Sequence, residues 1–148
     1  MGAVHRLATS ADAKRLFEIR RISILELAPS GMSVEAVQLW ATSLTPVGMK
    51  RKLREFETWL AEIDGEAVGW GAIRGDYLEG LYTAPDCAGR GVGTGLLAML
   101  EGLMRERGVR EVRAEASSNA RDFYLRRGYR ANGPQTPEGA WPIVKQLS

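Results

Sequence analysis

The sequence predicts a single α/β domain built around a mixed β-sheet, and three observations support that class. Two apolar strands joined by a tight-turn signal lie in the middle of the chain. Further strands then alternate with helical segments, an order typical of mixed sheets. The 148 residues, 45% of them hydrophobic, suffice for one domain with a buried core. We therefore expect one domain over residues 1–148.

The chain begins with a predicted strand and helix. Residues 3–7 are a short strand candidate. Thr9 or Ser10 can cap the helix that follows, because a hydroxyl accepts a hydrogen bond from a free N–H group at a helix start. Apolar residues then recur near one face, although Arg20 interrupts them. These apolar positions are Ala13, Leu16, Phe17, Ile24 and Leu27.

Turn residues divide the next part of the chain. Residues 29–31, Pro-Ser-Gly, end the first helix, and Ser33 can cap a second one. Pro46 and Gly48 predict a loop. The basic run at residues 50–54 has helical character. It suits a solvated helix face or a contact with an acidic substrate or phosphate, and the sequence does not separate the two.

A β-hairpin is predicted in the middle of the chain. Residues 58–63 and 67–73 are apolar-rich strands, and Asp64-Gly65 between them favours a type I′ turn. Gly69 and Gly71 lack side chains to pack, so they permit close approach by a neighbouring element or ligand.

Another strand and a long helix follow. Residues 74–76 turn the chain into a strand over 77–83, and Gly108 ends the helix. We expect Glu101 and Arg105 to form an outward-facing pair four residues apart. The apolar residues at helical spacing are Val92, Leu96, Leu97, Leu100, Leu103 and Met104.

The last part of the chain predicts two strands around a short helix. Residues 109–116 alternate as a strand does, and a helix over 120–127 ends at Gly128. Residues 141–147 form a closing strand, which Pro142 makes an edge or a bulge at its start.

The most informative segment is the glycine-rich loop before the long helix. Glycines occupy every second position from 89 to 95. Without Cβ atoms, successive N–H groups can surround one anion, and the helix start adds the positive end of its dipole. We therefore predict a phosphate or pyrophosphate site. No lysine follows as in a P-loop, and the third glycine of a dinucleotide fingerprint would fall at Thr94, Leu96 or Ala98.

Two segments here resemble the GNAT (GCN5-related N-acetyltransferase) family. Ala88-Gly-Arg-Gly-Val-Gly93 is similar to its Gln/Arg-x-x-Gly-x-Gly/Ala signature, with Ala88 in place of the usual Gln or Arg, and Leu81-Tyr-Thr-Ala-Pro85 is similar to its fourth strand. The resemblance implies the GNAT fold and a loop that wraps the pyrophosphate of acetyl-coenzyme A. The Arg90 guanidinium can also meet a phosphate. The implied coenzyme-binding residues are Leu81, Tyr82, Thr83, Ala88, Gly89, Arg90, Gly91, Val92, Gly93, Thr94, Gly95 and Asn119.

Tyr124 is the candidate proton donor to the coenzyme thiolate. It lies in Asn119-Ala-Arg-Asp-Phe-Tyr-Leu-Arg-Arg-Gly-Tyr129, which resembles the family's Ala-x-x-Phe-Tyr-x-x-x-Gly-Phe segment. A phenol is protonated at neutral pH, so it can release a proton as charge gathers on sulfur. The alternative is a tyrosine that only packs under the sheet.

Asn119 is a further candidate, which can cap the short helix or reach the pantetheine arm. The position at which the family usually has this Asn is occupied by Ser117 in this sequence.

Glu79 is the candidate that handles the acceptor amine. We expect residues 77, 79 and 81 to share one face of a strand that meets the thioester. A carboxylate there can attract a cationic amine and accept its proton, directly or through water. The alternative is an exposed strand carboxylate, and Asp76 is a weaker substitute for the same role.

Composition argues against several classes of protein. The single cysteine, Cys87, allows no internal disulfide, and the single histidine, His5, leaves no polyhistidine metal centre, so we expect no metal. A net charge of +2 is too small to indicate nucleic acid. No apolar run is of membrane-spanning length, and we expect a cytoplasmic protein. An edge strand near the C-terminus leaves a homodimer open.

The predicted function is transfer of an acetyl group from acetyl-coenzyme A to a primary amine by direct attack in a ternary complex. The alternative is a non-catalytic coenzyme A-binding sensor or regulatory module on the same fold. Small amines, aminoglycosides, polyamines and protein N-termini all stay open as acceptors, because the segment implied to select the acceptor carries no diagnostic motif.

Overall fold

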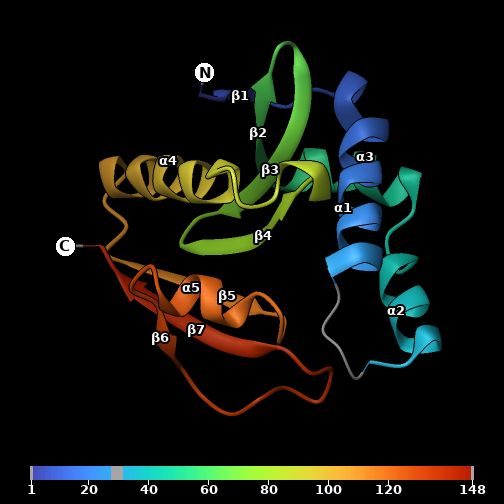
Figure 1. Ribbon diagram of the computed structural model, residues 1–148. Coiled ribbons are helices and arrows are strands. Elements are labelled where there is room, and N and C mark those ends of the chain that lie inside the picture. The colour runs from blue at the N-terminus through green and yellow to red at the C-terminus, as the bar shows by residue number, and fades with distance from the viewer. Residues whose placement is uncertain (1, 28–31, 148) are drawn as a thin grey trace.

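The computed structural model describes residues 2–27 and 32–147, which contain a seven-stranded sheet (Figure 1). The strand order is β1-β2-β3-β4-β5-β7-β6. Neighbouring strands are antiparallel except β4 and β5, which are parallel. The strands are β1 (Val4–Leu7), β2 (Glu57–Ile63), β3 (Glu66–Arg74), β4 (Tyr77–Thr83), β5 (Glu111–Ala116), β6 (Arg130–Ala131) and β7 (Trp141–Gln146). The expected mixed sheet is confirmed.

Helices lie on both faces of this sheet. The first face is covered by α1, with α2 and α3 packed against α1, and the opposite face is covered by α4 and α5 (Figure 1). The helices are α1 (Ala13–Leu27), α2 (Val34–Ala41), α3 (Pro46–Glu55), α4 (Val92–Glu106) and α5 (Arg121–Leu125), and the short 3-10 turns are η1 (Ser10–Asp12) and η2 (Pro85–Cys87). The expected break at residues 29–31 lies outside the described residues.

Local signals explain most of the element boundaries. Thr9 precedes η1, and its N–H group donates to the Asp12 carboxylate over 2.8 Å. The Ser33 hydroxyl accepts a hydrogen bond from the Ala36 N–H group at the start of α2, as the sequence predicts. Asp64 and Gly65 both have positive φ, 53° and 79°, which confirms the predicted type I′ hairpin turn.

The loop predicted at Pro46 and Gly48 is wrong. Pro46 is the first residue of α3, where a missing N–H group costs nothing, and the Thr45 hydroxyl caps the helix by accepting from the Gly48 N–H group. The basic run at residues 50–54 lies on α3, so its helical character is confirmed. The two-residue strand β6 was not predicted from the sequence.

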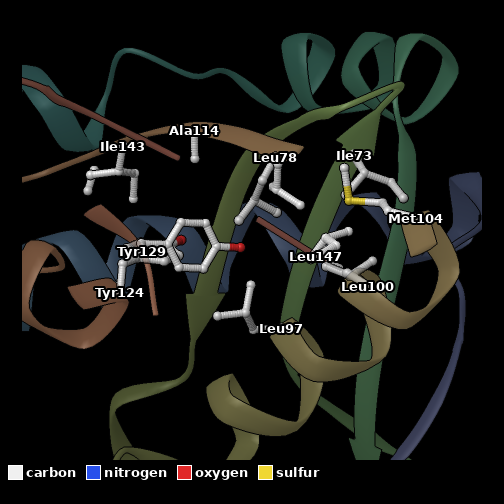
Figure 2. Close-up of a cluster of buried hydrophobic side chains, with 12 residues drawn as sticks. Ile73, Leu78, Leu97, Leu100, Met104, Ala114, Tyr124, Tyr129, Ile143 and Leu147 are labelled. Carbon is white, nitrogen blue, oxygen red and sulfur yellow. The ribbon is translucent and has the colours of Figure 1, made fainter. Parts of the chain in front are cut away.

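The core between α4, α5 and the sheet is apolar and contains two tyrosines. Figure 2 shows Leu97 and Leu100 of α4 facing Leu78 of β4. Tyr124 and Tyr129 enter the same cluster, and their rings meet edge to face with centroids 5.3 Å apart (Figure 2). Burial of these side chains holds α4 and α5 against one half of the sheet.

Two glycines in β3 bring α4 close to the sheet. A Cβ atom on Gly69 would lie 2.9 Å from Cγ1 of Val92, and one on Gly71 would lie 2.7 Å from Cδ1 of Leu100. Real Cβ atoms essentially never come this close to other atoms. The predicted close approach is therefore confirmed, and the neighbour is α4 itself.

Glu101 is the largest departure from the predicted surface of α4. The residue is only 7% exposed. It accepts a hydrogen bond from the Tyr129 hydroxyl over 2.7 Å and binds the Lys145 ammonium over 2.9 Å. Arg105 donates instead to the Leu147 carbonyl oxygen. The predicted outward pair of Glu101 and Arg105 is wrong, because partners distant in the sequence bury the carboxylate.

Candidate active site

The sheet opens where β4 and β5 run parallel. The start of β4 pairs with the middle of β5, with Tyr77 opposite Arg113 and Leu78 opposite Ala114. Beyond these residues no pairing continues, so the carboxyl ends of the strands diverge (Figure 1). The carboxyl ends of parallel strands are the common place for ligands in α/β sheets.

A cleft of about 360 Å³ lies at this divergence. Helices α1 and α2 form one wall, and the end of β4, the first turn of α4 and the β5–α5 segment form the others. The lining residues are Ser23, Ile24, Trp40, Leu81, Tyr82, Thr83, Gly93, Ser117, Asn119, Ala120, Phe123 and Tyr124. The cleft thus collects many of the site residues that were predicted from the sequence.

The glycine-rich loop presents free N–H groups beside the cleft. Gly89 and Gly91 both have φ of 80°, a left-handed conformation that glycine adopts at little cost. Their N–H groups have no hydrogen-bond acceptor among the described residues, and the same holds for Val92, Gly93 and Thr94 in the first turn of α4. Gly93 and Gly95 belong to the helix rather than to the loop. Five donors at the positive end of a helix form a suitable seat for an anionic group.

Tyr124 reaches the cleft from α5. The residue is 6% exposed, and burial raises the pKa of its hydroxyl well above the ordinary value, helped by the nearby Tyr82 and Glu101. No described residue makes a hydrogen bond to this hydroxyl. A phenol with a raised pKa stays protonated at neutral pH, so the group can donate a proton or a hydrogen bond into the cleft.

A β-bulge in β4 changes which residues share a face. Ala72 of β3 is opposite Gly80 and Ile73 is opposite Leu78, so Glu79 is the extra residue. Leu78 and Leu81 both pack on the α4 side of the sheet. The expectation that residues 77, 79 and 81 share one face is therefore wrong, because the bulge interrupts the alternation.

Glu79 forms an ion pair with Lys52 of α3, on the face that α1 and α3 cover. The carboxylate is about three-quarters buried and does not line the cleft itself. Of the basic run on α3, Lys52 therefore contacts an acidic residue of the protein. The ion pair gives Lys52 a role within the protein, so this one cation of the run needs no ligand to account for it.

Ser117 and Asn119 lie together at the β5–α5 turn. The Ser117 hydroxyl donates to Oδ1 of Asn119 over 2.5 Å, and both residues line the cleft. Of the two roles considered for Asn119, helix capping is not found, because Ala120 occupies the N-cap and α5 has no side-chain cap. The position of Asn119 in the cleft wall leaves the pantetheine role as a proposal.

A family model for the acetyltransferase (GNAT) domain matches residues 29–144, which is most of the chain. The chain belongs to the GNAT family. An uncharacterized N-acetyltransferase of Escherichia coli strain K12, YafP, is 27% identical over 132 residues, 88% of this chain and 84% of that protein.

Solved GNAT structures superpose closely on this protein. A GCN5-related N-acetyltransferase from Rhodopseudomonas palustris has a TM-score of 0.90 and 28% identity, covering 99% of this chain and 96% of that one. The PaiA N-acetyltransferase from Thermoplasma acidophilum, solved in complex with coenzyme A, has a TM-score of 0.84 with 20% identity and covers 99% of both chains, which is a likeness of fold. This GNAT protein is accordingly an N-acetyltransferase.

Arg127 lies beside the start of α4 in this GNAT protein, and sequence reasoning did not single it out. Its guanidinium donates twice to the Thr94 hydroxyl, over 3.1 and 2.6 Å, and once to the Phe123 carbonyl oxygen. It also lies 3.7 Å from the centroid of the Phe123 ring. The guanidinium therefore adds a cation beside the first turn of α4. No local signal marks it, because Thr94 is distant in the sequence.

Arg90 lies on the other side of the loop. It lines a second hollow of about 210 Å³ together with His5, away from the main cleft. Cys87 is buried beneath the loop, which agrees with a structural rather than a reactive thiol. Within residues 2–27 and 32–147, no three potential metal-ligating side chains cluster, and no helix has the length and hydropathy to span a membrane.

Proposed function

We propose that this GNAT protein transfers the acetyl group of acetyl-coenzyme A to a primary amine, with the donor held along β4 and the start of α4. The observation that carries the proposal is the set of five N–H groups, from Gly89 and from residues 91–94, that find no acceptor within the described part of the chain and lie beside the open end of the sheet. These donors suit a pyrophosphate, since they combine backbone N–H groups with a helix dipole.

The proposed coenzyme-binding surface has two parts. Residues 88–95 hold the diphosphate through their backbone, with Arg90 and Arg127 as cations on either side of the loop. Residues 81–83 line the cleft and hold the pantetheine arm through their backbone, together with Asn119. When bound, acetyl-coenzyme A supplies an acetyl thioester that an amine can attack.

Tyr124 acts in this proposal as the proton donor to the departing thiolate. Its hydroxyl is free of hydrogen bonds to the described residues, its pKa is raised by burial, and the residue lines the cleft. These are the properties that a neutral general acid needs. The edge-to-face contacts with Phe123 and Tyr129 keep the ring in one orientation.

Glu79 acts in this proposal on the acceptor amine, through an intervening water molecule. The carboxylate lies on the face of the sheet that α1 and α3 cover, where the acceptor enters between α1 and α2. Lys52 holds the carboxylate in place through the ion pair. An ionised carboxylate can take up the proton that the amine loses.

The test is a thiol-release screen with acetyl-coenzyme A against putrescine, kanamycin, 2-phenylethylamine and an alanyl peptide. We expect release of free coenzyme A thiol with at least one amine. Coenzyme binding by calorimetry without release for any amine would instead favour the non-catalytic coenzyme A-binding module. Absence of coenzyme binding would overturn the proposal altogether.

The Tyr124→Phe variant tests the proposed proton donor. It should lower turnover by about 10²-fold, in the range of one general acid, while coenzyme affinity persists. Tyr129→Phe is the matched control, because it also removes a tyrosine hydroxyl from the same cluster, one bound to Glu101 instead of facing the cleft. A loss of coenzyme affinity with unchanged turnover of the bound enzyme would reverse the assignment.

A further inference from the structure

The cleft has two chemically different sides. Thr83 and Leu81 face the α4 side of the sheet, near Gly93 and the coenzyme-binding loop. Tyr82 faces the opposite side and packs with the cluster under α1. Ser23 and Ile24 of α1 and Trp40 of α2 line the same cleft. The Tyr82 side chain therefore lies on the side where the acceptor enters, although only its backbone was expected to matter.

Surrounding residues fix the Tyr82 ring. Its centroid lies 4.9 Å from that of Trp70, which is fully buried and donates its indole N–H group to the Leu16 carbonyl oxygen. The Arg20 guanidinium lies 5.7 Å from the Tyr82 centroid and is itself held by the Ser43 hydroxyl. A ring with contacts of this kind loses little additional freedom when a ligand binds.

Gly80 provides the space in which the ring lies. A Cβ atom on Gly80 would lie 2.8 Å from Cε2 of Tyr82 and 3.3 Å from its hydroxyl oxygen. The ring therefore rests directly over the backbone of β4, beside the bulge at Glu79. Any larger residue at position 80 would push the hydroxyl away from this place.

The Tyr82 hydroxyl has no hydrogen-bond partner among the residues that the structure describes. Among those residues only Arg121 Nε is a fully buried side-chain polar atom without a partner, so the Tyr82 hydroxyl is open to the cleft that its residue lines. A rigidly held hydroxyl without one, in the wall of a cleft, is suited to a ligand that supplies it. The phenol can donate one hydrogen bond and also accept one.

We propose that the Tyr82 hydroxyl accepts a hydrogen bond from the acceptor amine and aims the nitrogen lone pair across β4 toward the coenzyme side. This inference rests on the proposed function. The reacting nitrogen needs orientation more than activation, because a neutral amine is already a nucleophile. Tyr82 is then a catalytic residue on the acceptor side, with Tyr124 on the coenzyme side and Glu79 as the more distant proton acceptor.

The experiment is steady-state kinetics of Tyr82→Phe with the panel amine that the wild-type protein acetylates fastest. The phenylalanine ring keeps the contact with Trp70, so the fold should persist. We expect kcat/KM for the amine to fall about tenfold, the effect of one hydrogen bond. The KM for acetyl-coenzyme A should not change. Gly80→Ala, which displaces the same ring, should lower kcat/KM for the amine in the same direction.

Tyr77→Phe is the matched control, because Tyr77 lies on the same strand but does not line the cleft. Kinetics of Tyr82→Phe equal to those of Tyr77→Phe would overturn the inference alone, and so would an equal loss for amine and coenzyme. Absence of acetyl transfer by the wild-type protein with every panel amine would overturn the inference together with the proposed function.

Discussion

The position of α4 over the sheet depends on Gly71, and its substitution by alanine gives a quantitative test of the packing. The new Cβ atom would lie 2.7 Å from Cδ1 of Leu100, 2.9 Å from Cδ1 of Leu81 and 3.3 Å from the Gly80 carbonyl oxygen. Leu100 is 1% exposed, so its side chain can move only against other packed residues.

Crowding of this kind typically costs about 1–3 kcal/mol. The smaller conformational freedom of alanine in the unfolded chain offsets about 0.4–1 kcal/mol of that cost. The net loss is then roughly 0–2.6 kcal/mol with a centre of about 1.3 kcal/mol, and the central value lowers Tm by roughly 3–5 °C for a chain of this size.

Thermal denaturation followed by circular dichroism measures this effect, with Gly102→Ala as the matched control. Gly102 lies in the middle of α4, and a Cβ atom there meets nothing within 4 Å. Alanine in a helix interior is better than glycine by about 0.5–1 kcal/mol, so this variant should raise Tm. A Gly71→Ala protein as stable as Gly102→Ala would refute the reasoning that β3 glycines admit α4.

Three further predictions follow from individual contacts. Glu101→Ala leaves the Lys145 ammonium without its buried carboxylate, so urea denaturation should report a loss of about 2–4 kcal/mol, and an unchanged midpoint would contradict it. The bidentate ion pair with the arginine of β1 holds the pKa of Asp12 below its ordinary value. This contribution to the free energy of unfolding is present above about pH 4 and is lost as the pH falls through the lower folded pKa of Asp12. Asp12→Asn removes the contribution. Urea titrations between pH 7 and 2 should therefore show a loss of stability toward acid that is smaller than in the wild-type protein, by less than about 1 kcal/mol. Gly91→Ala forces a side chain into the left-handed region at a cost of about 1 kcal/mol, and it should weaken acetyl-coenzyme A binding in calorimetry. Gly75→Ala is the control, because Gly75 is also left-handed but lies in the turn before β4. This variant should leave the affinity for acetyl-coenzyme A unchanged.

Features that depend on local chemistry could be predicted from the sequence. The turn at residues 64–65, the strand at 77–83 and the glycine-rich loop before α4 each follow from neighbouring residues. In each case the backbone conformation is set by residues a few positions apart, as the positive φ values of Gly65, Gly89 and Gly91 illustrate. The same local pattern that suggests an anion site also suggested the family, so fold and site were predicted together.

Features that depend on distant partners could not be predicted in this way. A carboxylate four residues before an arginine indicates a surface pair, yet Lys145 and Tyr129 bury Glu101 from elsewhere in the chain. Arg127 reaches Thr94 across the fold in the same manner. Helical periodicity says which face of α4 is apolar, but it does not say which polar residues another strand will cover.

The bulge at Glu79 accounts for the different chemistry of the two sides of the cleft. Leu78 faces α4, so regular alternation would place Tyr82 on the α4 side and would turn Leu81 and Thr83 toward α1. The extra residue reverses this pattern beyond position 79. Leu81 and Thr83 consequently face α4 and its glycine-rich start, while the Tyr82 ring packs on the α1 side. A single inserted residue in β4 thus turns Leu81 and Thr83 to the proposed donor side and Tyr82 to the proposed acceptor side, the reverse of what regular alternation predicts from the sequence.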